Sequence, residues 1–445
     1  MRVVIIGASH AGISAATQLK QLNPKIDVVL IERTHSLAYL ASALHLVLAD
    51  QLETLKQGQR MTLDELIRLN IHVMLDTNVT KIDPKQKTVT LNVIDETAET
   101  LSYDRLILAM GSTQPQIPIE FQTGEITTYK SFKAATRALE KFEQVDQVAI
   151  IGAGLIGLEL ADALKNQKEV VLIDRMNDVL FRYFDSELTH IIKEHLRQNV
   201  TIYLGETIQK IVKHDKTQEI HLREKQLMTQ AIVYAVNPRP TIDLVTDFLE
   251  ITLDGTIKTD AFLRTSDEHI YAIGDLISLP FKNTQETSYI PLLSNAITTG
   301  LVAAQNIVLG NQLICPSVQR TVVSSFFGLH VASTGITQEE APYYGISSDS
   351  YTKTFHLHTH KQPKKAFVTL KLVYKTDTKQ LIGGQLLTDS SRYVDWIDLI
   401  SLAINQETSI DTLAVMDFYF QPLFNEPIHP VSQVALAILA KNRDT

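Results

Sequence analysis

The chain has 445 residues, 44% of them hydrophobic and 20% charged, which is typical of a globular protein with more than one hydrophobic core. Lys and Arg number 41 against 50 Asp and Glu, and this net charge of −9, without any basic run, argues against a nucleic-acid partner. The single cysteine, Cys315, excludes an intrachain disulfide and a cysteine-rich metal or iron–sulfur site, and we expect a cytoplasmic protein.

Two apolar runs bear on membrane association. Val3–Ile6 ends at Gly7, too early for the apolar part of a signal peptide. Val434–Ala440 is shorter than the roughly 20 apolar residues that cross a bilayer. We expect this second run to form a buried or interfacial helix, and we expect no membrane partner.

The N-terminal passage reads as strand, glycine turn, helix, strand and acid. Val3–Ile6 is a β-branched run of the kind found in buried parallel strands, and a second such run ends at Glu32. Between them, Gly7, Ser9 and Gly12 occupy the three small-residue positions of a dinucleotide-binding turn. Such a turn lets the helix N-terminus meet a pyrophosphate, while the acid accepts from ribose hydroxyls. The passage predicts a first dinucleotide site.

The same pattern returns in the middle of the chain. Its strands are Val148–Ile151 and Val170–Ile173, its turn has glycine at all three positions, and its acid is Asp174. The turn glycines are Gly152, Gly154 and Gly157. A lone glycine motif is weak evidence, but the ordered pattern occurring twice predicts two bound dinucleotides. Electrons can pass between two such cofactors only if one is a flavin that the other's nicotinamide reduces.

Two further strands end close to glycines. Leu106–Leu108 leads to Gly111, and Ile270–Ile273 leads to Gly274 and Asp275. Either segment alone is equally consistent with a plain strand end and with a cofactor contact.

These segments, taken in order, resemble the pyridine nucleotide–disulfide oxidoreductases along essentially the whole chain. The nearest group contains the NADH oxidases, NADH peroxidases and coenzyme A disulfide reductases. The matching segments are Gly7–Gly12, Met110–Ser112, Gly152–Gly157 with Glu159, Tyr271–Asp275, Tyr289–Leu292 with Ser294–Ala296, and Phe418–Pro422.

The resemblance implies an α/β fold with two Rossmann-like domains and a C-terminal α+β dimerisation domain. Its expected domains are an FAD-binding domain of residues 1–115 and 245–316, an NAD(P)H-binding domain of residues 116–244, and a dimerisation domain of residues 317–445. The implied FAD-binding residues are Gly7, Ser9, Gly12, Glu32, Gly111, Gly274 and Asp275. The implied NADH-binding residues are Gly152, Gly154, Gly157, Glu159 and Asp174. The aromatic segment Phe418–Phe424 would lie near the flavin of the other subunit of a homodimer.

The choice of nicotinamide cofactor depends on two neighbouring residues. The Asp174 carboxylate would repel the 2′-phosphate of NADPH, which favours NADH. Arg175 could bind that phosphate, so NADPH is the less favoured alternative.

One departure from the resembling proteins decides the expected chemistry. Their redox cysteine falls within the segment Tyr39–His45, and here its position is occupied by Ser42. A thiolate can be oxidised by peroxide to a sulfenic acid and reduced again, whereas a serine hydroxyl has no such oxidised state. We therefore expect an NADH oxidase that reduces O2 and releases H2O2, without peroxidase or disulfide-reductase activity.

Two histidines near this position have different expected roles. His10 matches the family's active-site histidine and would hydrogen-bond Ser42 or supply charge or a proton to oxygen, although a structural role in the first helical turn is equally consistent. His45 reads as a core or interface histidine.

Two alternatives stay open. The electrons could pass to a quinone, a small electron carrier or a xenobiotic, for which Val434–Ala440 and the absence of a basic docking run give little support. A flavin-binding sensor with little turnover is the other, and the intact second glycine motif argues against it.

Overall fold

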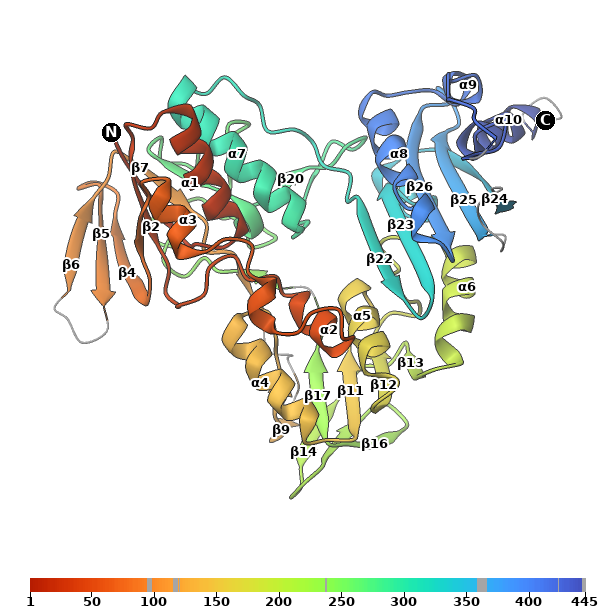
Figure 1. Ribbon diagram of the computed structural model, residues 1–445, viewed down its shortest axis with the longest axis horizontal. Helices are drawn as coiled ribbons and strands as arrows, with labels where there is room; N and C mark the ends of the chain where they lie inside the picture. The colour runs from red at the N-terminus through yellow and green to blue at the C-terminus, as the bar shows by residue number, and fades with distance from the viewer. Residues whose placement is uncertain are drawn as a thin grey trace.

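The computed structural model describes residues 1–93, 98–114, 119, 121–236, 238–357, 366–422 and 424–441. The chain forms three lobes, with the N-terminal lobe on the left of Figure 1, the middle of the chain below and the C-terminal lobe on the right. Residues near 300 return to the first lobe, where helix α7 (Leu293–Leu309) lies beside α1 (His10–Leu22).

The first lobe is built on a parallel sheet of order β19-β7-β1-β2-β3. Its strands are β1 (Arg2–Ile6), β2 (Asp27–Ile31), β3 (His72–Met74), β7 (Arg105–Leu108) and β19 (Ile270–Ala272). In register, Ile6 lies opposite Ile31, so the first glycine of the turn and the acid Glu32 emerge side by side. An antiparallel sheet flanks this core, with strands β4 (Thr77–Asp83), β5 (Thr88–Val93) and β6 (Glu99–Ser102).

The second lobe repeats this plan. Its parallel sheet has the order β10-β17-β11-β12-β13, and Ile151 lies opposite Ile173, which brings Gly152 beside Asp174. The strands are β10 (Ile126–Thr127), β11 (Gln147–Ile151), β12 (Glu169–Asp174), β13 (Thr201–Leu204) and β17 (Ala231–Tyr234), and the helices are α4 (Phe132–Glu143), α5 (Leu155–Leu164) and α6 (Ser186–Arg197). A second sheet holds β9 (Phe121–Gln122), β14 (Lys210–Lys213), β15 (Gln218–His221) and β16 (Gln226–Thr229).

The third lobe is an antiparallel sheet covered by helices. The strand order is β22-β23-β26-β25-β24, with bounds β22 (Val322–Phe326), β23 (Leu329–Gly335), β24 (Ser348–Leu357), β25 (Ala366–Lys375) and β26 (Leu381–Thr388). The helices are α8 (Trp396–Asn405), α9 (Ile410–Ala414) and α10 (Pro430–Lys441). The predicted apolar helix is α10, which buries Val434, Ala435 and Ile438. None of the helices within the described residues is long and apolar enough to cross a membrane.

Short elements connect these parts. They are α2 (Ala43–Leu48), α3 (Leu63–Arg68), the 3-10 turns η1 (Leu55–Gly58), η2 (Gly274–Leu276), η3 (Ala341–Tyr344) and η4 (Ser391–Tyr393), and the strands β8 (Ser112–Thr113), β18 (Arg239–Pro240), β20 (Leu279–Pro280) and β21 (Thr287–Ser288). The predicted fold class is confirmed: two Rossmann-like parallel sheets and a C-terminal α+β unit. The expected domain boundaries stay predictions, and the one at 115/116 lies outside the described residues.

Buried charges hold the second lobe against the third. The ammonium of Lys371, on β25, lies 2.9 Å from the Asp185 carboxylate at the start of α6, and both side chains are almost fully buried. Gln385 also donates to Asp185 over 2.6 Å. Buried charges are tolerated only when they are paired in this way, so the contact fixes the seating of α6 on the C-terminal sheet.

Candidate functional site

The first glycine turn has the geometry that a pyrophosphate needs. Gly7 has φ +107°, and a Cβ there would stand 2.3 Å from the carbonyl oxygen of Ala109. A Cβ on Gly12 would stand 1.9 Å from the Gly7 carbonyl oxygen. Ser9 is the N-cap of α1, and its side chain makes no capping bond, so the first N–H groups of the helix are free to receive phosphate oxygens.

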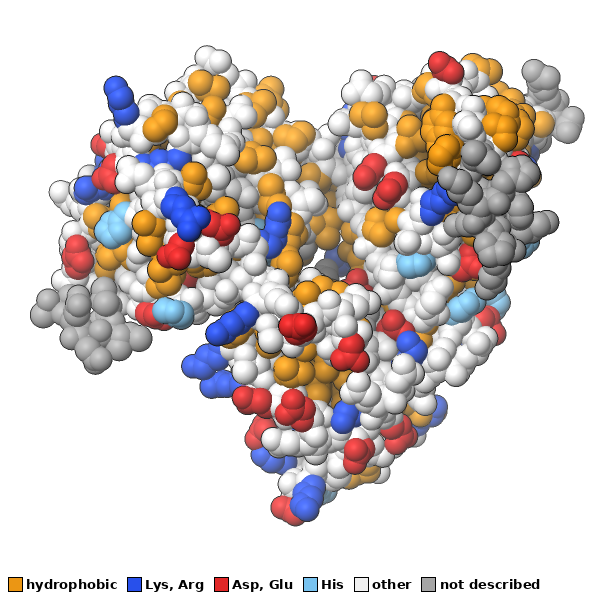
Figure 2. Space-filling model, in the orientation of Figure 1, with side chains coloured by type: hydrophobic (Ala, Val, Ile, Leu, Met, Phe, Trp, Pro, Cys, Tyr) orange, Lys and Arg blue, Asp and Glu red, His pale blue; other side chains and the backbone are white. Residues whose placement is uncertain are grey.

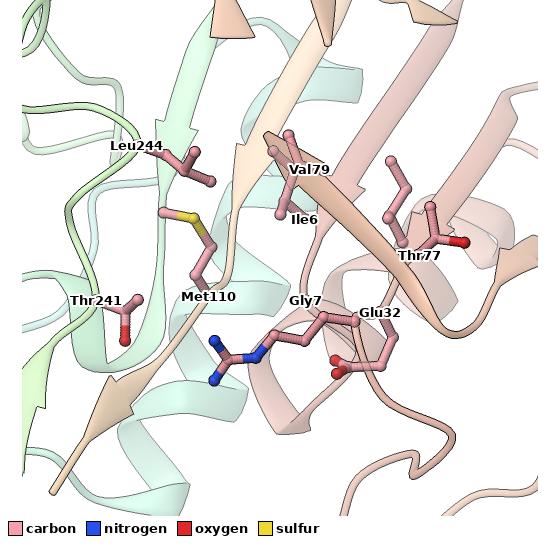
Figure 3. A pocket seen from close by; sticks show the side chains of 10 residues that line it. Ile6, Gly7, Glu32, Thr77, Val79, Met110, Thr241 and Leu244 are labelled. Atoms are coloured by element: carbon pink, nitrogen blue, oxygen red, sulfur yellow. The ribbon is translucent and has the colours of Figure 1, made fainter. Parts of the chain in front are cut away.

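Glu32 closes the turn from the end of β2. One carboxylate oxygen accepts from the Ala8 N–H over 3.0 Å, and the other accepts from the Thr34 N–H and hydroxyl. An open hollow of about 460 Å³ lies beside it. Figure 3 shows Glu32 and Thr77 on one side of this hollow and Met110, Thr241 and Leu244 on the other.

Thr241 shows that the hollow suits a polar ligand. Its buried hydroxyl has no hydrogen-bond partner in the described part of the chain, and an unpaired buried hydroxyl is costly. The uncapped helix, the glycine cradle and this hydroxyl together fit a dinucleotide such as FAD.

The second turn has a geometry closely similar to that of the first. Gly152 has φ +114°, and a Cβ on Gly157 would again stand 1.9 Å from the carbonyl oxygen of the first glycine. Gly154 is the N-cap of α5 and has open space around it, where a ligand backbone can approach. Asp174 accepts from the Ala153 N–H over 2.6 Å and from the Met176 N–H over 2.8 Å. These residues fit a second dinucleotide.

Asp275 lies where the ends of two strands of the first sheet meet. It belongs to η2, directly after Gly274, whose φ is +66°. The Ser112 hydroxyl donates to the Asp275 carboxylate, next to Gly111, and the Lys130 ammonium lies 3.0 Å from the same oxygen. Burial lowers the pKa of Lys130, while Asp275 opposes that shift. Lys130 was not predicted, because it stands in no motif and reaches the site only through the fold.

His10 contacts the backbone three residues before Ser42. His10 begins α1, and its Nε2 is 3.2 Å from the carbonyl oxygen of Tyr39. Ser42 is the N-cap of α2, and its side chain makes no capping bond. The bond from His10 therefore goes to Tyr39 and not to the Ser42 hydroxyl. Burial, helped by the charge of Arg60, lowers the pKa of His10 below 6.5, while Tyr39 and Asp275 oppose the shift.

A second hollow lies beside His10. It has an open volume of about 640 Å³ and is lined by α1, α7 and the segment around Arg60. Figure 2 shows the molecule hollowed between the first and third lobes. The residues that line the hollow beside His10 all belong to the first lobe, and this hollow gives a small molecule access to the His10 side chain.

Glu159 lies apart from the glycine turn, on the second turn of α5. Its carboxylate accepts from the Ser324 hydroxyl over 2.6 Å and lies 3.6 Å from Nδ1 of His45. His45 is therefore an interface histidine, as the sequence predicts. Ser324 was missed, because it is one serine in the alternating pattern of β22 and no local signal distinguishes it.

Cys315, the only cysteine, takes no part in this site. It is 5% exposed and packs in the core of the first lobe, where burial raises its pKa to about 11. At neutral pH it is a protonated thiol, which is a poor nucleophile.

Comparison with known proteins agrees with this geometry. Residues 1–300 match the model of the family described as pyridine nucleotide-disulphide oxidoreductase, and residues 321–431 match its dimerisation domain. The chain belongs to this family. It is accordingly an oxidoreductase, and the predicted resemblance is confirmed.

Similar proteins match over nearly their whole length. An NADH oxidase of Enterococcus faecalis is 29% identical and covers 99% of each chain, and one of Streptococcus pyogenes is 30% identical, covering 98% of this chain and 99% of its own. Among solved structures, the water-forming NADH oxidase of Lactobacillus brevis bound to NADH has a TM-score of 0.95 at 28% identity, covering 100% of this chain and 99% of its own.

Proposed function

We propose that this protein is an FAD-dependent NADH oxidase that transfers two electrons from NADH to O2 and releases H2O2. The observation that carries the product is Ser42 together with the burial of the only thiol, Cys315. The oxidase activity itself is supported by the family and by the NADH oxidases that match over the full length.

The residues divide between two cofactors. FAD, which supplies the two-electron chemistry when bound, would be held by Gly7, Ser9, Gly12, Glu32, Gly111, Gly274 and Asp275. NADH would be held by Gly152, Gly154, Gly157, Glu159 and Asp174. This assignment divides the chain as expected, with FAD on residues 1–115 and 245–316, NADH on 116–244, and dimerisation by 317–445. Glu32 and Asp174 each already accept from a backbone N–H of their own turn, so they are oriented before a ribose arrives.

The overall reaction balances without a cysteine. NADH gives a hydride, O2 takes up two electrons and two protons, and one proton comes from solvent. Ser42 cannot take up an oxygen atom from the product, because its hydroxyl forms no equivalent of a sulfenic acid. Peroxide therefore leaves the site instead of being reduced to water. The Lactobacillus brevis relative is described as a water-forming NADH oxidase. We propose that Ser42 is the reason why this protein releases peroxide instead of water.

His10 is proposed to assist the step with O2. Burial lowers its pKa, so the imidazole is neutral at pH 7 and gains a positive charge only at a pH below the ordinary range of histidine. A positive charge stabilises negative charge forming on oxygen, so reoxidation of the reduced protein by O2 is expected to accelerate toward low pH. His10→Ala is expected to remove that acceleration and to slow reoxidation about tenfold at the acid end of the profile. Mixing reduced protein with air-saturated buffer measures both effects. An unchanged profile in His10→Ala would assign His10 a structural role.

The third lobe is proposed to join two copies into a homodimer. Four apolar side chains of its last connection are at least half exposed in one copy, which marks an uncovered contact surface. They are Val415, Tyr419, Phe420 and Ile428. Tyr419→Asp would bury a charge in that contact, so the variant is expected to sediment as a monomer. Leu253→Asp, at an even more exposed apolar site of the first lobe, is expected to leave the dimer intact. A dimeric Tyr419→Asp would place the contact elsewhere.

A compartment and a second candidate acceptor are also proposed. We propose the cytoplasm, because the chain has one buried thiol and no disulfide. A quinone or a small electron carrier is the second candidate acceptor, and the hollow beside His10 is the observation in its favour.

Two half-reactions test the proposed function. NADH added without oxygen is expected to bleach the visible absorbance of the FAD-loaded protein, and air is expected to restore it. Bleaching that air does not reverse would leave the NADH site in place and move the acceptor to a quinone or carrier. Failure of NADH to bleach the protein would overturn the function.

A further inference from the structure

Three lobes meet at one carboxylate. Helix α2 comes from the first lobe, α5 from the second and β22 from the third, and the three lie together near the centre of Figure 1. Glu159 on α5 presents one oxygen to the Ser324 hydroxyl at 2.6 Å and the other to Nδ1 of His45 at 3.6 Å. Each oxygen of this carboxylate is therefore faced by a group from a different lobe.

The buried surroundings of the Glu159 carboxylate disfavour its ionised form. Side-chain exposure is 19% for Glu159 and 17% for His45. Burial raises the pKa of Glu159, and the bond from Ser324 opposes that rise. Burial lowers the pKa of His45 to about 4, with Asp162 opposing. At neutral pH His45 is an uncharged polar ring, and its Nδ1 faces the carboxylate.

The other titratable groups near Glu159 are already paired or uncharged, so His45 and Ser324 are the groups that act on its carboxylate. Asp162, one turn along α5, is paired with Lys165, whose ammonium also lies over the Phe327 ring. Tyr129, from the segment before α4, is buried, and its pKa is raised by burial and further by Glu159. A buried tyrosine stays protonated and adds no charge.

We propose that His45 and Ser324 are positioning residues for NADH: they keep Glu159 ionised and fix its orientation toward the nicotinamide half of the cofactor. The inference rests on the proposed function, because it requires NADH on α5. Glu159 stands two residues after Gly157, on the helix whose N-terminus faces the second turn. An ionised carboxylate has about four acceptor sites, so it can keep Ser324 and still accept from the carboxamide or ribose of NADH.

His45 lies three residues after Ser42, at the start of the same short helix, so the contact with Glu159 also joins α5 to the segment that carries Ser42.

The test measures the affinity for NAD+ by calorimetry and the anaerobic bleaching rate with NADH, both across pH. In the unmodified protein both are expected to fall as the pH drops and Glu159 takes up a proton. Ser324→Ala removes the donor from a buried carboxylate, and His45→Leu replaces the polar ring that faces its other oxygen with an apolar side chain, so the acid limb is expected to move to higher pH by about one unit in each. His45→Asn places an amide N–H near the Nδ1 position and is expected to move the limb most of the way back. Glu159→Gln is expected to abolish the limb.

The outcomes separate the inference from the proposed function. If the unmodified protein is not bleached by NADH and binds no NAD+, the function fails and the inference fails with it. If the unmodified protein is bleached, an acid limb that stays in place in both His45→Leu and Ser324→Ala overturns the inference alone. A loss of NAD+ affinity and of bleaching rate by the same factor at every pH, without rescue by His45→Asn, would show that the contact between His45 and Glu159 is purely structural. If His45→Leu does not fold, the position of the acid limb in Ser324→Ala alone tests the inference.

Discussion

Ser42→Cys is expected to cut the peroxide released per NADH by about fivefold or more while NADH consumption continues. The introduced thiolate would attack the O–O bond of H2O2, taking one oxygen as a sulfenic acid and releasing the other as water. A second NADH would then restore the thiol and release a second water. The yield of peroxide per NADH therefore falls, although the same two nucleotide sites are used.

The matched control is Ser42→Ala, which removes the hydroxyl without adding sulfur and is expected to leave the peroxide yield unchanged. Cys315 serves as an internal control for thiol chemistry, because it is buried and protonated and should not react with a sulfenic-acid probe. Retention of the full peroxide yield by Ser42→Cys, with no probe labelling, would show that residue 42 does not stand at the redox position.

Gly12→Val and Gly157→Val are each expected to impair the binding of a different cofactor. In each, the first side-chain carbon would stand 1.9 Å from the carbonyl oxygen of the first glycine of its turn. Helix and strand must then move apart, and the phosphate cradle is lost. Gly12→Val is expected to purify without bound flavin. Gly157→Val is expected to keep the flavin but to lose at least about a hundredfold in its rate of bleaching by NADH.

Flavin content after purification and anaerobic bleaching measure this pair of variants. Dithionite gives the control, since it reduces bound flavin without using the second site and should bleach Gly157→Val normally. The reverse pattern, in which Gly157→Val loses the flavin and Gly12→Val keeps it, would exchange the assignment of the two sites.

The two turns were predictable because their geometry is local. Only a small residue fits against the carbonyl oxygen of Ala109 or Ala235, so Gly7 and Gly152 had to be glycine. The β-branched runs before them could only be buried strands, and the strand register then places Glu32 and Asp174 beside their turns. Fold class and family followed from these local rules applied twice.

The remaining contacts are set by long-range packing. Lys130 meets Asp275, a residue 145 positions away, and Ser324 meets Glu159, a residue 165 positions away. No spacing rule connects such pairs, because they depend on how the lobes are seated against one another. Within the first lobe, His10 pairs with the carbonyl of Tyr39, 29 positions away, and not with Ser42. The resemblance predicts that His10 and Ser42 lie close together, but the path of the backbone decides which oxygen His10 contacts.

The measurement that tests the central proposal most directly is the number of H2O2 molecules released per NADH consumed by the FAD-loaded protein in air. Since Ser42 cannot be oxidised and Cys315 is buried, we predict one peroxide for each NADH. Rapid NADH consumption with little or no peroxide would contradict the proposal, because the protein would then form water without a cysteine at position 42.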